Sequence, residues 1–210
     1  VKSLRLVIAA LLLLAAAPVE AAQQEEVSAT FEAYQAALQA TDGEKAAGIV
    51  TQGSRDLYRH YANQALTLDH AALNRVHIAD RLTIMLLRHS LERERLMQMS
   101  GGEIIAYAVE QGWISKEGTA GIRLGNYQVA GEMATGTLLR TDGSETDFTV
   151  EFLKEDGDWH LNLKQMLEFA RIGIEYAVQQ AGMSEDEFIL TLLEYSTGRR
   201  PDPGIWNPPS

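Results

Sequence analysis

Hydrophobic positions in the first half of the chain recur every three or four residues, which predicts a series of amphipathic helices. Phe31, Tyr34 and Leu38 lie on one face of the first helix, Ser28 is its candidate N-cap, and Asp42, followed by glycine, should end it. The other helices expected are residues 44–50, a helix capped by Ser54, a long helix over residues 69–98 capped by Asp69, and a helix that starts with the capping box Ser100-Gly-Gly-Glu103 and stops at Gly112.

After residue 121, hydrophobic positions alternate with polar ones, and this period of two is typical of half-buried strands. Strands are expected over residues 122–130, 133–140, 148–152 and 159–163. Aspartate-glycine pairs at Asp142 and Asp156 separate the last three segments, and such pairs are the strongest short hairpin signal. The strands should therefore form an antiparallel meander with one face towards solvent.

Helical spacing returns in residues 167–181, which Gly182 should close. A second capping box, from Ser184 to Glu187, begins a last helix that should end at Gly198. A block of helices, a block of strands and helices again indicate an α+β fold rather than a parallel α/β fold. The sequence thus predicts a helical N-terminal half packed on an antiparallel sheet, with two extra C-terminal helices.

The beginning of the chain has the pattern of a secretory signal peptide. Lys2 and Arg5 precede the apolar run 6–17, and small residues lead up to Ala21, the predicted last residue before cleavage. The apolar run is shorter than the roughly 20 residues that a membrane-spanning helix needs. We therefore expect residues 1–21 to be removed and the protein to be exported, in soluble form, to the periplasm or the outside of the cell.

The rest of the chain divides into one domain and a tail. Residues 22–198 contain no linker or repeat and should form a single domain. Residues 199–210 are rich in proline and form a C-terminal tail. Trp206 in that tail is a large apolar group that would be unusual in a free chain end, so we expect the tail to dock. Docking on its own domain is favoured over docking on a partner.

Composition and missing motifs exclude several function classes. The formal net charge of −11 becomes −12 without residues 1–21, because Lys2, Arg5 and Glu20 leave with them. A chain this acidic is a poor candidate for binding nucleic acid or an anionic membrane surface. It has no cysteine, which excludes disulfides, thiolate metal ligands and cysteine nucleophiles. The sequence motifs of P-loop nucleotide hydrolases, dinucleotide enzymes, zinc proteases and elbow-type serine hydrolases are also missing.

A set of short motifs resembles one known superfamily. The motifs are Phe31, Tyr34 and Leu38 on the first helix, then Asp42-Gly43-Glu44, then Tyr58 and Tyr61, and finally Phe152-Leu-Lys-Glu-Asp-Gly-Asp-Trp-His-Leu161. Over residues 27–166 this pattern resembles the nuclear transport factor 2-like superfamily, also called the SnoaL-like or ketosteroid isomerase-like cone. The resemblance implies a curved sheet wrapped on the helices around a conical pocket. It does not specify a function, because the superfamily hosts isomerases, dehydratases, binding proteins and scaffolds.

The chain departs from that superfamily in two places, and both bear on the pocket. The helical stretch 69–112 is longer than the usual insert before the sheet, and two helices and a tail follow the last strand. Either addition could plug or cover the pocket.

Five residues are the candidates for contacting a ligand in such a pocket: Tyr34, Tyr58, Tyr61, His77 and Asp80. Isomerase-like members of the superfamily use a carboxylate base together with a tyrosine or an acid in an apolar pocket, and Asp80 with a tyrosine would resemble that pair. His77 and Asp80 lie three residues apart and would supply only half of a metal site. We therefore expect neither a metal nor a cofactor.

Three functions stay open at this point. Non-catalytic binding of a small apolar or amphipathic molecule is favoured, because no convergent acid-base set is visible in the sequence. An isomerase or dehydratase would need an open pocket with a carboxylate beside a tyrosine or histidine. A protein-interaction module of the cell envelope would have a filled cone. Besides a small molecule, the partner expected is a second copy of the chain, paired through the sheet.

Overall fold

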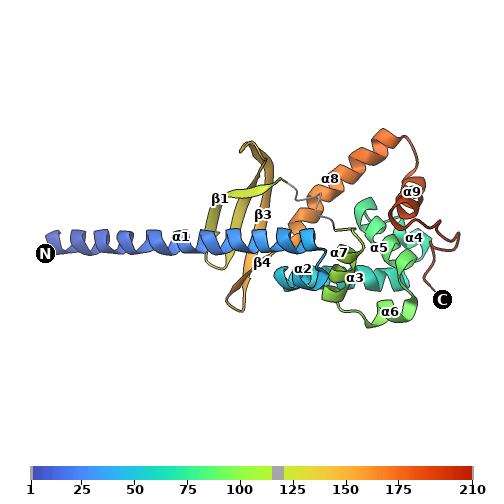
Figure 1. Ribbon diagram of the computed structural model, residues 1–210, viewed down its shortest axis with the longest axis horizontal. Coiled ribbons are helices and arrows are strands. Elements are labelled where there is room, and N and C mark those ends of the chain that lie inside the picture. Colours follow the sequence, from blue (N-terminus) through green and yellow to red (C-terminus); the bar gives the residue numbers. More distant parts are fainter. Residues whose placement is uncertain (1, 115–120, 210) are drawn as a thin grey trace.

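The computed structural model describes residues 2–114 and 121–209. Within these residues the protein is an α+β fold with nine helices and one curved, four-stranded antiparallel sheet (Figure 1). The helices are α1 (Lys2–Ala40), α2 (Gly43–Ile49), α3 (Gln52–Thr67), α4 (His70–Leu73), α5 (Ile78–Ser90), α6 (Arg93–Gln98), α7 (Gly101–Glu110), α8 (Leu163–Ala181) and α9 (Glu185–Thr197). The strands are β1 (Arg123–Ala130), β2 (Met133–Leu139), β3 (Glu145–Glu155) and β4 (Asp158–Leu161). No helix in the described residues is both long and apolar enough to cross a membrane.

The sheet confirms the predicted meander. Its strands follow one another in the order β1-β2-β3-β4, and every neighbouring pair is antiparallel. Ala134 pairs with Phe152, and Phe152 pairs with Leu161, so the apolar residues of successive strands share one face. Helix α1 lies across that face (Figure 1), where the Phe31 ring packs edge-on against Phe152 with 6.5 Å between ring centroids.

The two predicted aspartate-glycine turns are present. Gly143 adopts a φ of 84° in the β2–β3 connection, and Gly157 adopts a φ of 97° between β3 and β4. Such positive values are accessible to glycine without a steric cost, which explains why a glycine follows the aspartate in both turns.

The prediction of one long helix over residues 69–98 is wrong, because the chain forms three short helices there: α4, α5 and α6. Asp69 caps only α4, by accepting a hydrogen bond from the backbone of Ala72. The helix stops after Leu73, and His77 begins α5 by accepting a hydrogen bond from the backbone of Ala79 through its own ring. Histidine is not a common N-cap, so this break has no clear sequence signal.

Two other predicted caps are also wrong. Ser28 lies inside α1, which runs on to Ala40. Thr51, rather than Ser54, caps α3, with its side chain accepting a hydrogen bond from the Ser54 backbone. By contrast, both predicted capping boxes are confirmed, at Ser100 and at Ser184.

The hydrophobic core extends from the apolar face of the sheet, which α1 and α2 contact, into the space between α2, α3, α5 and α7. Its largest fully buried side chains are Phe31, Tyr34, Leu73, Ile84, Met85, Leu87, Leu96, Ile104, Ile105, Phe152, Leu161 and Ile189. Close packing of this core fixes the positions of the helices that surround the candidate site.

After the sheet, α8 runs diagonally away from β4 towards α9 (Figure 1). It begins at Leu163, earlier than the predicted residue 167, because Asn162 caps it by accepting a hydrogen bond from the Lys164 backbone. Only Leu163 in this long helix is fully buried. Gly182 ends α8 in the left-handed conformation, as predicted.

The described part of the C-terminal tail docks on its own domain, as favoured from the sequence. Ile205 is buried, and the Trp206 ring stacks on His70 with 4.6 Å between ring centroids. The Arg88 guanidinium of α5 donates hydrogen bonds to the backbone carbonyls of Ile205 and Trp206, at 3.2 and 3.0 Å. The tail thereby joins α4 and α5.

Candidate functional site

A cavity of about 330 Å³ lies between α1, α3, α5, α7 and α8. This volume is within the range of small-molecule pockets, roughly 300–1,000 Å³. Apolar and aromatic side chains make up nearly all of the lining: Tyr34, Leu38, Tyr58, Ala79, Leu82, Thr83, Leu86, Ala108, Trp113, Ile114, Leu163, Met166, Leu167, Ala170 and Ile174. Among these described residues none carries a charge, so the cavity suits an uncharged or mostly apolar molecule.

Tyr34 and Tyr58 bring two hydroxyl groups to this lining, from α1 and α3. Burial raises the pKa of both hydroxyls well above the usual range, and for Tyr34 the neighbouring Tyr58 raises the pKa further. Both side chains therefore stay neutral and can donate a hydrogen bond. Neither hydroxyl has a hydrogen-bond partner within residues 2–114 and 121–209. Each hydroxyl can therefore donate a hydrogen bond to a molecule in the cavity, which makes both candidates for contacting a ligand.

The wall formed by α8 follows helical spacing. Leu163, Met166, Leu167, Ala170 and Ile174 project from one side of α8 and all line the cavity. These residues were not among the sequence candidates. The signal that could have found them was the amphipathic pattern of residues 167–181, which showed a helix but not the surface that it covers.

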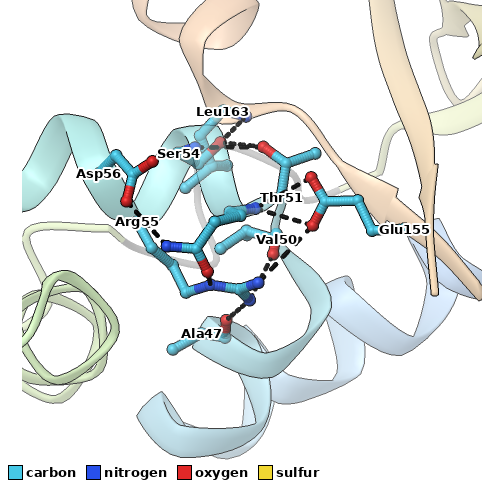
Figure 2. Close-up of polar contacts among 9 residues, drawn as sticks. Ala47, Val50, Thr51, Ser54, Arg55, Asp56, Glu155 and Leu163 are labelled. Carbon is cyan, nitrogen blue, oxygen red and sulfur yellow. Dashed lines mark hydrogen bonds and ion pairs between the residues drawn. The ribbon is translucent and has the colours of Figure 1, made fainter.

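A buried polar cluster fixes the start of α8, and Figure 2 shows its contacts. The hydroxyls of Thr51 and Ser54 lie 2.8 Å apart and are hydrogen-bonded to each other. The Ser54 hydroxyl also accepts a hydrogen bond of 2.9 Å from the backbone N–H of Leu163, the first residue of α8. Both side chains are fully buried, so this contact connects the first turn of α3 to the first turn of α8 without access of solvent.

The same cluster connects the helices to the sheet (Figure 2). The Glu155 carboxylate, at the end of β3, accepts a hydrogen bond of 2.8 Å from the backbone N–H of Gln52 at the start of α3. Its negative charge there favours the helix N-terminus. Arg55 donates to the carbonyl of Val50 at 2.7 Å and forms an ion pair of 3.6 Å with Glu155. These contacts give the cluster a structural role.

Tyr61 and Asp80 lie together beside the cavity rather than in its lining. The Tyr61 hydroxyl donates a hydrogen bond of 2.8 Å to Asp80, and Asp80 forms an ion pair of 2.7 Å with Arg171 of α8. Burial and the hydrogen bond to Asp80 raise the pKa of Tyr61 well above its usual range. His77 forms a second contact with α8, since its ring lies 2.8 Å from the Glu175 carboxylate.

The structure therefore divides the five sequence candidates into two groups. Tyr34 and Tyr58 line the cavity, whereas His77 and Asp80 join α5 to α8, and Tyr61 of α3 donates its hydrogen bond to Asp80. His77 and Asp80 do not converge on one point, because each is paired with a different residue of α8. Arg171 and Glu175 complete these contacts and were not anticipated, because no local pattern relates α8 to α5.

In comparisons with known proteins, no protein-family model, curated protein or solved structure matches this chain. A functional assignment therefore depends on the cavity, its lining and the two tyrosine hydroxyls.

Proposed function

We propose that this chain is an exported protein, periplasmic or extracellular, of the nuclear transport factor 2-like superfamily, which binds a small and mostly apolar molecule without transforming it. The observation that carries the proposal is the apolar cavity of about 330 Å³ between α5 and α8. Transfer of apolar surface from water into such a lining stabilises a complex by roughly 25 cal/mol for each Å² buried.

The two tyrosine hydroxyls support an amphipathic ligand rather than a pure hydrocarbon. Tyr34 and Tyr58 are neutral donors in the lining, and a polar atom of the ligand would satisfy them. The neighbouring apolar residues of α5 and α8, including Leu82 and Ile174, would contact the rest of the molecule.

Two alternatives are less well supported. An isomerase or dehydratase would need a carboxylate in the lining, but the Asp80 carboxylate is engaged by Tyr61 and Arg171 outside it. An interaction module with a filled cone would have no room for a ligand at this position. The cavity volume thus counts against the filled cone, and the lack of a carboxylate among the described lining residues counts against the isomerase or dehydratase.

A binding assay tests the proposal. The uncharged fluorophore N-phenyl-1-naphthylamine becomes brighter in apolar surroundings, so we expect its emission to rise and to saturate with the purified protein. The variant Ala170→Trp places a large ring in the cavity wall and should weaken binding about tenfold or more, which corresponds to about 1.4 kcal/mol.

The matched control is Gln179→Trp, which adds the same ring to an exposed position of α8 outside the lining. It should bind the fluorophore like the parent protein. If the parent protein does not saturate with the fluorophore, or if both variants bind equally well, the cavity is not a binding site.

Three parts of the proposal concern export, family and assembly. The sequence of residues 1–21 supports export, and N-terminal sequencing of the exported protein should begin at Ala22. Helix α1 across one face of a meander sheet supports the cone-like superfamily. The homodimer through the sheet stays a prediction, which chemical cross-linking with mass mapping of the sheet residues would check.

A further inference from the structure

Helix α8 has a second apolar side that residues 2–114 and 121–209 leave largely exposed. Phe169, Ile172 and Tyr176 follow one another at spacings of three and four, so they form a continuous stripe. Ile172 is 64% exposed and Tyr176 is 63% exposed, whereas Phe169 is half-buried against Phe148 of β3. Together with Gly173, these three residues of α8 form the surface that we call the α8 stripe. Large apolar side chains gathered in this way commonly mark an interaction surface.

Three charged residues of α8, Glu168, Arg171 and Glu175, already have partners in their own chain. Arg171 is paired with Asp80 at 2.7 Å and with Glu168 at 2.8 Å. Glu175 is paired with His77 at 2.8 Å. A molecule that packs on the α8 stripe would therefore not leave these charges without a partner, which is the usual cost of covering a charged helix.

We propose that the α8 stripe is a dimer interface, on which the same stripe of a second copy packs in the antiparallel direction. The order of the residues carries this inference. Reading the stripe from either end gives an aromatic ring, a gap of two residues and the central pair Ile172-Gly173. A two-fold axis between Ile172 and Gly173 therefore places each Phe169 opposite Tyr176 of the other copy, as an isologous interface requires.

Gly173 makes the centre of that interface accessible. A Cβ atom added at this position would have nothing within 4 Å, so the helix backbone is open to a neighbour there. Ile172 of one copy can pack over Gly173 of the other, as a ridge fits into a groove between packed helices. Aromatic rings at both ends then extend the contact along the helix axis.

The size of the interface predicts a reversible dimer. Helix α8 has 19 residues, which corresponds to a length of about 28 Å at about 1.5 Å per residue. One helix pair of this length buries less than the roughly 1,600 Å² of a standard stable interface. The fraction of dimer should therefore rise with protein concentration.

Engineered cysteines test the geometry, because the chain has no cysteine of its own. Ile172→Cys lies beside the two-fold axis and should form a disulfide-linked dimer on mild oxidation. Phe169→Cys alone should not form such a dimer, because the two copies of residue 169 would lie about 10 Å apart along the helix axis at about 1.5 Å per residue. A disulfide needs Cα atoms that are no more than roughly 7 Å apart. A mixture of Phe169→Cys and Tyr176→Cys should form a mixed disulfide. Tyr195→Cys, which is exposed on α9, is the control and should not form a disulfide-linked dimer.

Sedimentation of the unmodified protein gives an independent readout. The average mass should rise towards that of two chains with concentration, and Ile172→Arg should stay at the mass of one chain while keeping the parent's circular dichroism. Tyr195→Arg should behave like the parent protein. A parent protein that stays monomeric at all concentrations, or a dimer that persists in Ile172→Arg, would overturn the proposal. The second outcome would point instead to the sheet.

Discussion

The Asp80 carboxylate and the Arg171 guanidinium form an ion pair of 2.7 Å that joins α5 to α8 beside the cavity. Their chain neighbours Ala79 and Ala170 both line the cavity, so the pair holds its two walls together. Asp80 is mostly buried and also accepts the hydrogen bond from Tyr61. We expect Asp80→Ala to lower the free energy of unfolding by about 1–3 kcal/mol, because Arg171 and Tyr61 both lose their partner. Urea denaturation measures this change.

Glu168→Gln is the control for the Asp80 variant. Glu168 contacts the same guanidinium at 2.8 Å, but its side chain is 61% exposed. An exposed ion pair contributes less than about 1 kcal/mol, so this variant should unfold almost like the parent protein. Equal losses in both variants would mean that Asp80 has no special role in holding α8.

Arg88 connects the tail to the end of α3. Its guanidinium donates to the carbonyls of Ala65 and Leu68 and to those of Ile205 and Trp206. We expect Arg88→Met to lower the free energy of unfolding by about 3–5 kcal/mol, because several buried carbonyls lose their donor. Trp206 should leave its stacked position on His70, so the tryptophan emission should shift to longer wavelength.

Arg200→Met is the matched control, because Arg200 is an exposed arginine of the tail itself. Loss of an exposed arginine should change the free energy of unfolding by less than about 0.5 kcal/mol. If the emission of Arg88→Met stays that of the parent protein, the tail is held by other contacts.

The fold was largely predictable because its local signals are strong and agree with one another. The capping boxes at Ser100 and Ser184 and the turns at Gly143 and Gly157 each specify the backbone within a few residues. The break of the predicted helix 69–98 at His77 was not predictable, because an imidazole cap lacks the usual sequence signal.

The candidate site was only partly predictable. Tyr34 and Tyr58, chosen as candidate ligand contacts, do line the cavity, and a contact with a ligand stays a prediction. Tyr61, His77 and Asp80 were placed in the same pocket, whereas the structure has them in contacts that join α5 to α3 and to α8. That difference depends on Arg171 and Glu175, whose long-range pairing with α5 has no periodic or local pattern.

His89 should make stability depend on pH. Burial and, to a smaller extent, the Arg199 guanidinium lower the pKa of His89 below its usual value, despite the hydrogen bond to the Arg199 carbonyl. The unfolded chain therefore binds the proton more readily than the folded one. The contribution of His89 to stability is complete above its ordinary pKa of about 6.5 and is lost as the pH falls below it.

Urea midpoints at about pH 7.5 and about pH 5.5 measure this effect. The urea midpoint of His89→Gln should decrease less between the higher and the lower pH than the midpoint of the parent protein does. His60→Gln replaces an exposed histidine, and its midpoint should decrease as much as that of the parent protein. If the midpoint of His89→Gln decreases as much as that of the parent protein, the pH dependence belongs to other groups.

Ser54 should affect stability and ligand binding together. Its hydroxyl accepts the hydrogen bond from the backbone N–H of Leu163, and Leu163 lines the cavity. Ser54→Ala leaves that buried donor without a partner, which should lower the free energy of unfolding by about 1–3 kcal/mol. Because the start of α8 is then less firmly held, the variant should also bind N-phenyl-1-naphthylamine more weakly. Ser28→Ala, on the outer side of α1, should change neither quantity, and a Ser54→Ala variant that is destabilised but binds normally would show that the cluster does not position the cavity wall.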